Sequence, residues 1–120
     1  MRGLLIKTEQ RCIEPIDLPD EGLSAVYVAL LINRGSRTVE AIRLDRCLVP
    51  SNDTLLVDEE GRLRRATQAL GGFTIGPAFF VGRGLIIGTR GSKFSDHRIL
   101  LTSLLDYIGW VPAPINGSPS

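Results

Sequence analysis

The amino-acid sequence predicts a single α+β domain, a small antiparallel or mixed β-sheet with one or two helices packed on it. Short runs rich in β-branched residues are typical of strands, and glycines between residues 71 and 91 break the chain as turns do. An amphipathic segment near the C-terminus has the start and stop signals of a helix. Because 120 residues suit one ordinary core, we expect one domain over residues 1–110 and a Pro-rich flexible tail over 111–120.

The first two runs lie at the N-terminus. Gly3–Thr8 and Arg11–Asp17 each contain β-branched residues, and Glu9 and Gln10 separate them. This spacing predicts two strands or one hairpin.

Residues 23–33 fit a helical face and a strand face equally well. Acidic residues directly after Pro19 and a closing Gly35 are typical of a helix. The β-branched content is typical of a strand that leads into another strand over residues 38–44. We favour the helix, and the strand stays open as the alternative.

The next signals are two turns. Leu55–Val57 runs into Asp58, two glutamates and Gly61, and Arg62–Arg64 follows with alternating character, which predicts a hairpin or at least a strand and a tight turn. Farther on, residues 78–81 and 85–87 read as core strands joined tightly through Gly82-Arg83-Gly84, a β-meander.

The glycine-rich stretch also suggests a phosphate-binding loop, and its details argue against one. Such a loop needs a helix directly after its glycines, where backbone amides meet the phosphates. Here a strand signal, Leu85–Ile87, follows Gly82 and Gly84, and the third glycine comes one residue late. The chain also lacks the GK[ST] sequence of a Walker loop.

The C-terminal segment predicts a helix from Ser95 to Ile108. Ser95 is suited to cap it, and Asp96 would meet the positive end of its dipole. Gly109 is well placed to end the helix. Its expected apolar stripe consists of Leu101, Leu104, Leu105 and Ile108.

Charge and cysteine usage set limits on partners and compartment. A net charge of +1 neither requires nor excludes nucleic acid. The apolar run of three residues at the N-terminus is too short for a secretory signal or a membrane span, so we expect a cytoplasmic protein without membrane contact. Cys12 and Cys47 lack CxxC spacing, and we expect both to be reduced and at least partly buried.

Candidate catalytic residues are few. His97 is the single histidine, which excludes a multi-histidine metal site, and the start of a helix ordinarily leaves it in solvent. Asp58, Glu59 and Glu60 form three acids on one turn, which is typical of a solvated tip. No nucleophile motif is present, so we expect no catalytic residue, no cofactor and no metal.

Arginines are the strongest candidates for binding. If the two turn regions are neighbours, their side chains form one basic face that docks an acidic protein surface or a phosphate backbone. No aromatic residue alternates with them in the sequence, as stacking on single strands would need. The predicted binding residues are Arg62, Arg64, Arg65, Arg83 and Arg90, with Lys93 and Arg98 farther off.

The chain contains four stretches in this order: RGLLIKTEQRCIEPIDLPDEGLSAV, DTLLVDEEGRLRR, FTIGPAFFVGRGLIIG and FSDHRILLTSLLDYIGW. In these stretches and their order, over roughly residues 2–110, it resembles a small family of uncharacterised proteins encoded by phages, plasmids and other mobile elements. The chain departs from that pattern around residues 33–37 and in its tail.

The resemblance implies a mobile genetic element in a bacterial cytoplasm. On that basis we expect a non-catalytic accessory protein that binds a host protein or complex and inhibits a host defence complex by covering its surface. One alternative is a small enzyme or nucleotide-binding protein that uses the glycine-rich segment and His97. A further alternative is a nucleic-acid-binding protein or a virion or assembly component.

Overall fold

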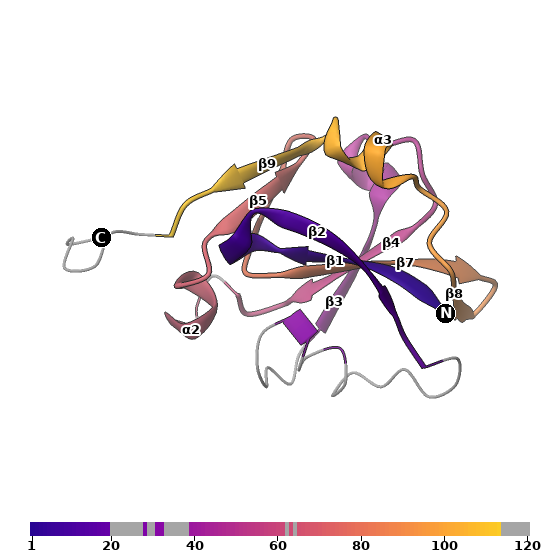
Figure 1. Ribbon diagram of the computed structural model, residues 1–120, viewed down its shortest axis with the longest axis horizontal. Coiled ribbons are helices and arrows are strands. Elements are labelled where there is room, and N and C mark those ends of the chain that lie inside the picture. The colour runs from indigo at the N-terminus through magenta and orange to yellow at the C-terminus, as the bar shows by residue number, and fades with distance from the viewer. Residues whose placement is uncertain (20–27, 29–30, 33–38, 62, 64, 114–120) are drawn as a thin grey trace.

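The chain folds mainly from β-strands. The computed structural model describes residues 1–19, 28, 31–32, 39–61, 63 and 65–113 (Figure 1). Within these residues there are nine strands in two antiparallel sheets, and the two α-helices whose bounds are described are only four and five residues long. The predicted α+β class, with helices packed on a sheet, is therefore wrong, and the protein is a small β-rich domain.

The main sheet is built around one late strand. Its order is β2-β1-β7-β4-β3, and β8 extends it by pairing with the end of β7. The bounds are β1 Arg2–Lys7, β2 Cys12–Asp17, β3 Val39–Arg43, β4 Thr54–Asp58, β7 Gly84–Arg90 and β8 Lys93–Ser95. The predicted N-terminal strand pair is confirmed, with Leu5 opposite Glu14, and so is the strand expected over residues 38–44.

The second sheet has the order β6-β5-β9, with β5 Gly72–Ile75, β6 Ala78–Val81 and β9 Ile108–Val111. Gly76, with a φ of +55°, turns β5 into β6. The predicted meander is wrong beyond this hairpin, because β6 and β7 belong to different sheets. Gly82, with a φ of +88°, takes the conformation that this crossing between sheets needs.

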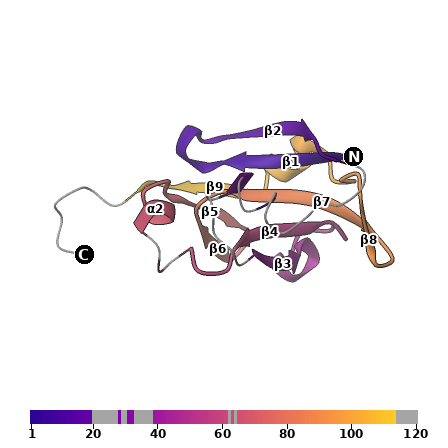
Figure 2. The ribbon, with the colours of Figure 1, turned by 90° about the horizontal axis from the view of Figure 1, so that it is seen from below.

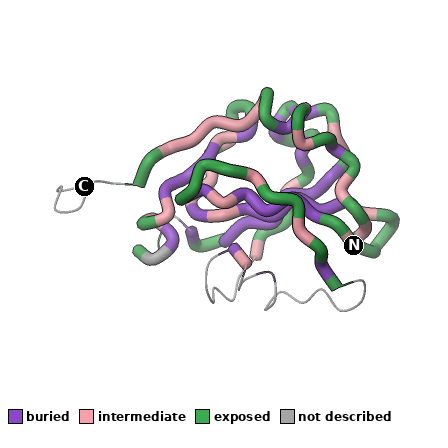
Figure 3. Tube along the Cα trace, viewed as in Figure 1, coloured by how far each residue is buried: buried purple, intermediate pink, exposed green. Residues whose placement is uncertain are grey.

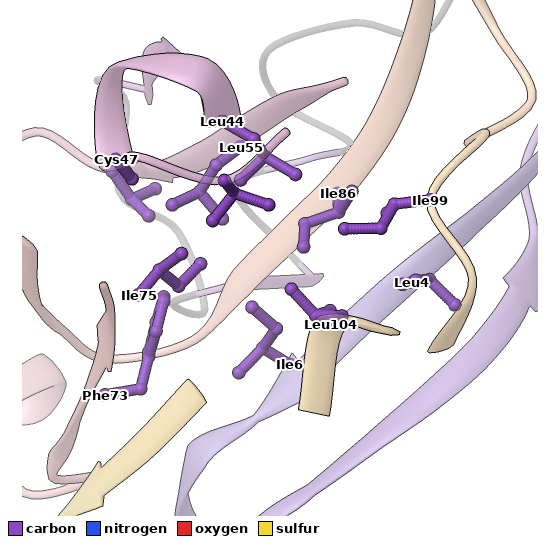
Figure 4. Close-up of a cluster of buried hydrophobic side chains, with 12 residues drawn as sticks. Leu4, Ile6, Leu44, Cys47, Leu55, Phe73, Ile75, Ile86, Ile99 and Leu104 are labelled. Carbon is purple, nitrogen blue, oxygen red and sulfur yellow. The ribbon is translucent and has the colours of Figure 1, made fainter. Parts of the chain in front are cut away.

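Two apolar clusters cover the two faces of the main sheet, which is why its central strands are almost continuously apolar. One lies between the sheets and receives Leu4, Leu55 and Ile86 from the main sheet and Phe73 from the second (Figure 4). The other lies on the opposite face and contains Leu5, Leu18, Val28, Ile32, Leu56, Leu85 and Ile87. Figure 3 shows the buried strands at the centre of the molecule.

The predicted helix from Ser95 to Ile108 is wrong. Only Leu101–Leu105 is helical, as α3. Before it, Ser95 pairs with β7 and the Asp96 carboxylate accepts the backbone N–H of Arg2; after it, Ile108 enters β9. Long-range strand pairing overrides the local helix signals. Leu104 is fully buried as expected, but Leu105 is 51% exposed.

Other expectations have mixed outcomes. The strand and tight turn at Asp58–Gly61 are present, but the return strand is replaced by α2, Arg65–Gln68, because β4 already has β3 and β7 as neighbours. Cys47 is buried as predicted, and Cys12 is exposed, contrary to prediction, because β2 is an edge strand. Both thiols are free.

Two predicted segments lie largely outside the described residues. Of residues 23–33, Val28, Leu31 and Ile32 are described, and these three are helical. In the predicted tail, Val111 belongs instead to β9, and residues 114–120 are not described.

Candidate functional site: an arginine-lined depression

The predicted arginines do not form one face. Arg83 precedes β7 and Arg90 ends it, so the length of the strand, about 23 Å, separates them. Arg65 begins α2, which lies at the Arg83 end (Figures 1 and 2). Arg62 and Arg64 lie outside the described residues. Of the three described arginines among the five predicted binding residues, Arg90 alone lies at the β8 end of the sheet.

The two turn regions themselves are neighbours, which was the condition set for a shared basic face. A β-carbon placed on Gly61 would lie 2.8 Å from the carbonyl oxygen of Val81. Thr67 of α2 donates a hydrogen bond of 3.1 Å to Asp58, and its methyl group packs against Gly82. The carboxylate of Asp58 thus fastens α2 to β4, which is a structural role.

Arg83 is engaged within the protein. Its guanidinium binds both carboxylate oxygens of Glu9, with 3.0 Å from Nε to Oε2, and it also donates to the carbonyl of Leu31 at 3.4 Å. Burial alone would raise the pKa of Glu9, but the hydrogen bond and charge of Arg83, with the charge of Lys7, outweigh it and lower that pKa. Both side chains are only 25% exposed, so this arginine is not presented to a partner.

Arg90 lies in a different setting, beside two arginines from other parts of the chain. Arg43 ends β3, and Arg98 lies in the extended segment before α3. The three line an open depression of about 710 Å³ at the end of the main sheet. Its other lining residues are Asn52, Thr54, Thr89 and Gly91. No acidic residue is among these lining residues of the described chain.

The backbone of Arg98 is fixed by a buried carboxylate. Asp53, which is 0% exposed, accepts the backbone N–H groups of Arg98 at 2.7 Å and Ile99 at 2.8 Å through the same oxygen. The chain reaches this position by crossing over Gly88, where a β-carbon would collide with the carbonyl oxygen of Asp96. Asp53 and Gly88 therefore position the Arg98 segment over the sheet.

The charges of this cluster are poorly compensated. Arg43 contacts Asp45 at 2.6 Å, in an exposed ion pair, and Asn52 at 3.4 Å. Arg90 stands directly opposite Lys93 in the β7–β8 ladder, an arrangement of like charges that destabilises a sheet. Among the residues that the structure describes, Arg90, Lys93 and Arg98 form no ion pair.

A second depression, of about 400 Å³, adjoins the first and shares Arg90 and Arg98 with it. Phe94, which is 40% exposed, lines it together with Met1, Ser95, Asp96 and His97. His97 is held in place, since its backbone N–H bonds to the carbonyl of Arg2 and its Nδ1 lies 2.9 Å from the carbonyl oxygen of Ile99. Phe94 thus lines the same depression as Arg90 and Arg98.

The glycine-rich stretch does not provide a phosphate loop. A β-carbon at Gly84 would lie 2.8 Å from Phe73 and 2.9 Å from Leu55, and one at Gly82 would meet Thr67. Both glycines are therefore closely packed by protein atoms. His97 also lies at the level of Gly88, about 13 Å along β7 from Gly84, so the two do not share a site.

Sequence reasoning missed Arg43 and the closeness of Phe94 to Arg90 and Arg98. Arg43 reaches the site only because β3 pairs with β4, placing it opposite Thr54. Phe94 comes near them because it pairs with Thr89, the residue before Arg90 in β7, and the β7–β8 hairpin around Gly91 was the local signal for this pairing.

No protein-family model, curated protein or solved structure matches this chain. Within the described part of the chain, no helix has the length and apolar character needed to cross a membrane. The same residues contain no group of three or more His, Cys, Asp or Glu side chains arranged to hold a metal ion.

Proposed function

We propose that this protein is a non-catalytic binding module that holds a polyanionic partner in the depression lined by Arg43, Arg90 and Arg98. The observation that supports this most directly is the convergence of three arginines from separate segments, two of them without a counter-ion in the described part of the chain. An anion bound there would also relieve the repulsion between Arg90 and Lys93.

The chemistry of the lining suits oxyanions. The planar guanidinium group binds two oxygens of a carboxylate or phosphate at once and keeps its charge at any physiological pH. Asn52, Thr54 and Thr89 add uncharged donors around the arginines. The open shape suits the surface of a large partner better than an enclosed small molecule.

The resemblance to proteins of phages and plasmids gives this proposal a biological setting. A module that covers a polyanionic surface keeps a host defence complex from using that surface. In this setting the protein acts in the bacterial cytoplasm by occlusion, without chemistry of its own.

The test is a charge reversal with a matched control. The variant Arg90→Glu with Arg98→Glu is compared with Arg11→Glu combined with Arg65→Glu, which changes the net charge equally at residues outside the depression. Fluorescence anisotropy measures binding to a labelled 12-residue polyglutamate and to labelled dT12. Because each charge-assisted hydrogen bond contributes about 1.5–3 kcal/mol, the double reversal should weaken binding about 100-fold or more.

Thermal melts of both variants check that the fold is intact. Equal weakening by the control pair would show that net charge alone drives binding. If the wild-type protein binds neither probe at low salt, the proposal is wrong.

A further inference from the structure

We infer that the polyanionic partner is single-stranded nucleic acid, with a base stacked on Phe94 and its flanking phosphates held by Arg90 and Arg98. This inference rests on the proposed binding function and names its ligand class. It depends on the exposed aromatic ring that lines one depression with Arg90 and Arg98, which a purely electrostatic site would not need.

The two depressions adjoin at Arg90 and Arg98. The basic depression and the one that contains Phe94 share Arg90 and Arg98, so these two side chains stand between an anion-binding region and an aromatic surface. Lys93, the neighbour of Phe94 in β8, adds a cation one residue away. Single-strand binding proteins combine these two features, a basic groove along the backbone and aromatic rings on which bases stack.

The exposure of Phe94 distinguishes nucleic acid from an acidic protein surface. The face of an aromatic ring carries partial negative charge, so it gains nothing from a carboxylate placed against it. A base has a π-face that stacks on the ring, and each such stack is worth about 5- to 150-fold in affinity by alanine substitution. Phe94 at 40% exposure leaves ring surface for this contact.

A double helix is the weaker candidate. Its bases are stacked on one another and offer edges rather than faces in the grooves. The arginines and Phe94 line open depressions. Phe94 in such a depression is suited to stack on a base of a single strand.

The experiment measures anisotropy of labelled dT12 with the wild-type protein and with Phe94→Ala, Phe94→Trp and Phe79→Ala. Phe79, in β6 of the second sheet, is 38% exposed and therefore serves as a matched control. We expect Phe94→Ala to weaken binding about 10-fold, Phe94→Trp to retain or tighten it, and Phe79→Ala to change it little. If three arginines contact phosphates, the slope of log K against log salt should be about −2.

Competition by unlabelled probes identifies the ligand class. We expect dT12 to compete better than the dT12·dA12 duplex, 12-residue polyglutamate or dTMP. A polyglutamate that competes better than dT12 would overturn the inference in favour of an acidic protein. Equal competition by the duplex, with no effect of Phe94→Ala, would overturn it in favour of phosphate contacts alone. Equal competition by dTMP would make a free nucleotide the ligand.

These outcomes separate the two proposals. If the inference fails and the proposed function stands, polyglutamate or duplex binds and remains sensitive to reversal of Arg90 and Arg98. If the proposed function itself fails, no probe responds to that reversal.

Discussion

Each end of strand β7 carries an arginine, but the two arginines differ in their ion pairing and exposure. Arg83, before the strand, is bound by the Glu9 carboxylate, touches the Leu31 carbonyl and is only 25% exposed. Arg90, at the other end, is exposed, faces Lys93 across the ladder and lies beside Arg98. Arg83 links the start of β7 to the β1–β2 turn through its pair with Glu9. Arg90 has no such partner among the described residues, which is why we assign binding to that end.

The comparison shows why arginines need to be sorted by their surroundings. An arginine paired with a carboxylate within its own chain has part of its hydrogen-bonding capacity, and its charge, already satisfied. An arginine opposite another cation is locally unfavourable in the free protein and gains when an anion arrives.

The largest expected effect concerns the apolar cluster between the two sheets, which both ends of β7 share. Leu104→Ala should destabilise the protein by about 2–5 kcal/mol, because this fully buried side chain leaves a cavity between the sheets. Leu105→Ala, at an exposed neighbour, should change stability by about 0.5 kcal/mol or less. Urea unfolding measures both. Separate unfolding of the two ends in Leu104→Ala would contradict a shared core.

Gly88→Ala tests the crossing that forms the Arg90 end. Its new methyl group would collide with the Asp96 carbonyl, so the segment that carries Arg98 must move. We expect a loss of about 1–3 kcal/mol together with weaker polyanion binding. Gly91→Ala is a useful comparison, because its added β-carbon meets no neighbour. Its cost comes from the backbone alone, since Gly91 has a φ of +63°. If folded Gly88→Ala binds the polyanion as tightly as the wild-type protein, the crossing over Gly88 does not contribute to the binding site.

Asp53→Ala removes the buried carboxylate that holds the Arg98 segment. Two backbone N–H groups then lose their acceptor, which should cost about 1–3 kcal/mol. The effect should be local to the Arg90 end, so hydrogen exchange should accelerate at Arg98 and Ile99 more than at Arg83. Equal acceleration at both ends would argue against a local role.

The smallest expected effect concerns the Glu9–Arg83 pair, at the Arg83 end of β7, and depends on pH. A carboxylate whose pKa is lower in the folded state contributes stability above its unfolded pKa, and this contribution is lost as pH falls through the folded value. Glu9→Gln should therefore cost up to about 1 kcal/mol at pH 7 and progressively less below about pH 4. Thermal melts across that range measure it. Arg90→Gln, the matched change at the other end of β7, should show no such loss.

Local signals predicted the parts of the fold that depend on neighbours in sequence. The β1–β2 hairpin and the turn at Asp58–Gly61 follow from alternation and turn residues, and both are present. The helix predicted from Ser95 failed because its helix signals compete with strand pairing, with β7 across a hairpin for Ser95 and with β5, far away in sequence, for Ile108. Sequence pattern alone does not reveal such partners.

The candidate site was predictable only in part for the same reason. Arg90 was identified from its residue type and its place after a strand. Arg43 and Phe94 join it through pairing of β3 with β4 and of β8 with β7. An arginine cluster assembled across a sheet becomes visible only when the strand order is known.

The place of β7 in the main sheet also sets the order in which the chain can fold. Leu4 of β1 and Leu55 of β4 both pair with Ile86 of β7, which lies between them. Neither pairing can form before β7 is present. The β1–β2 hairpin leaves the ribosome before β7, so the edge of β1 that pairs with β7 stays unpaired until β7 has been made. Contacts this distant in sequence slow folding relative to helical proteins of equal length. During synthesis, the open side of β1 is the surface most prone to pair with the wrong strand.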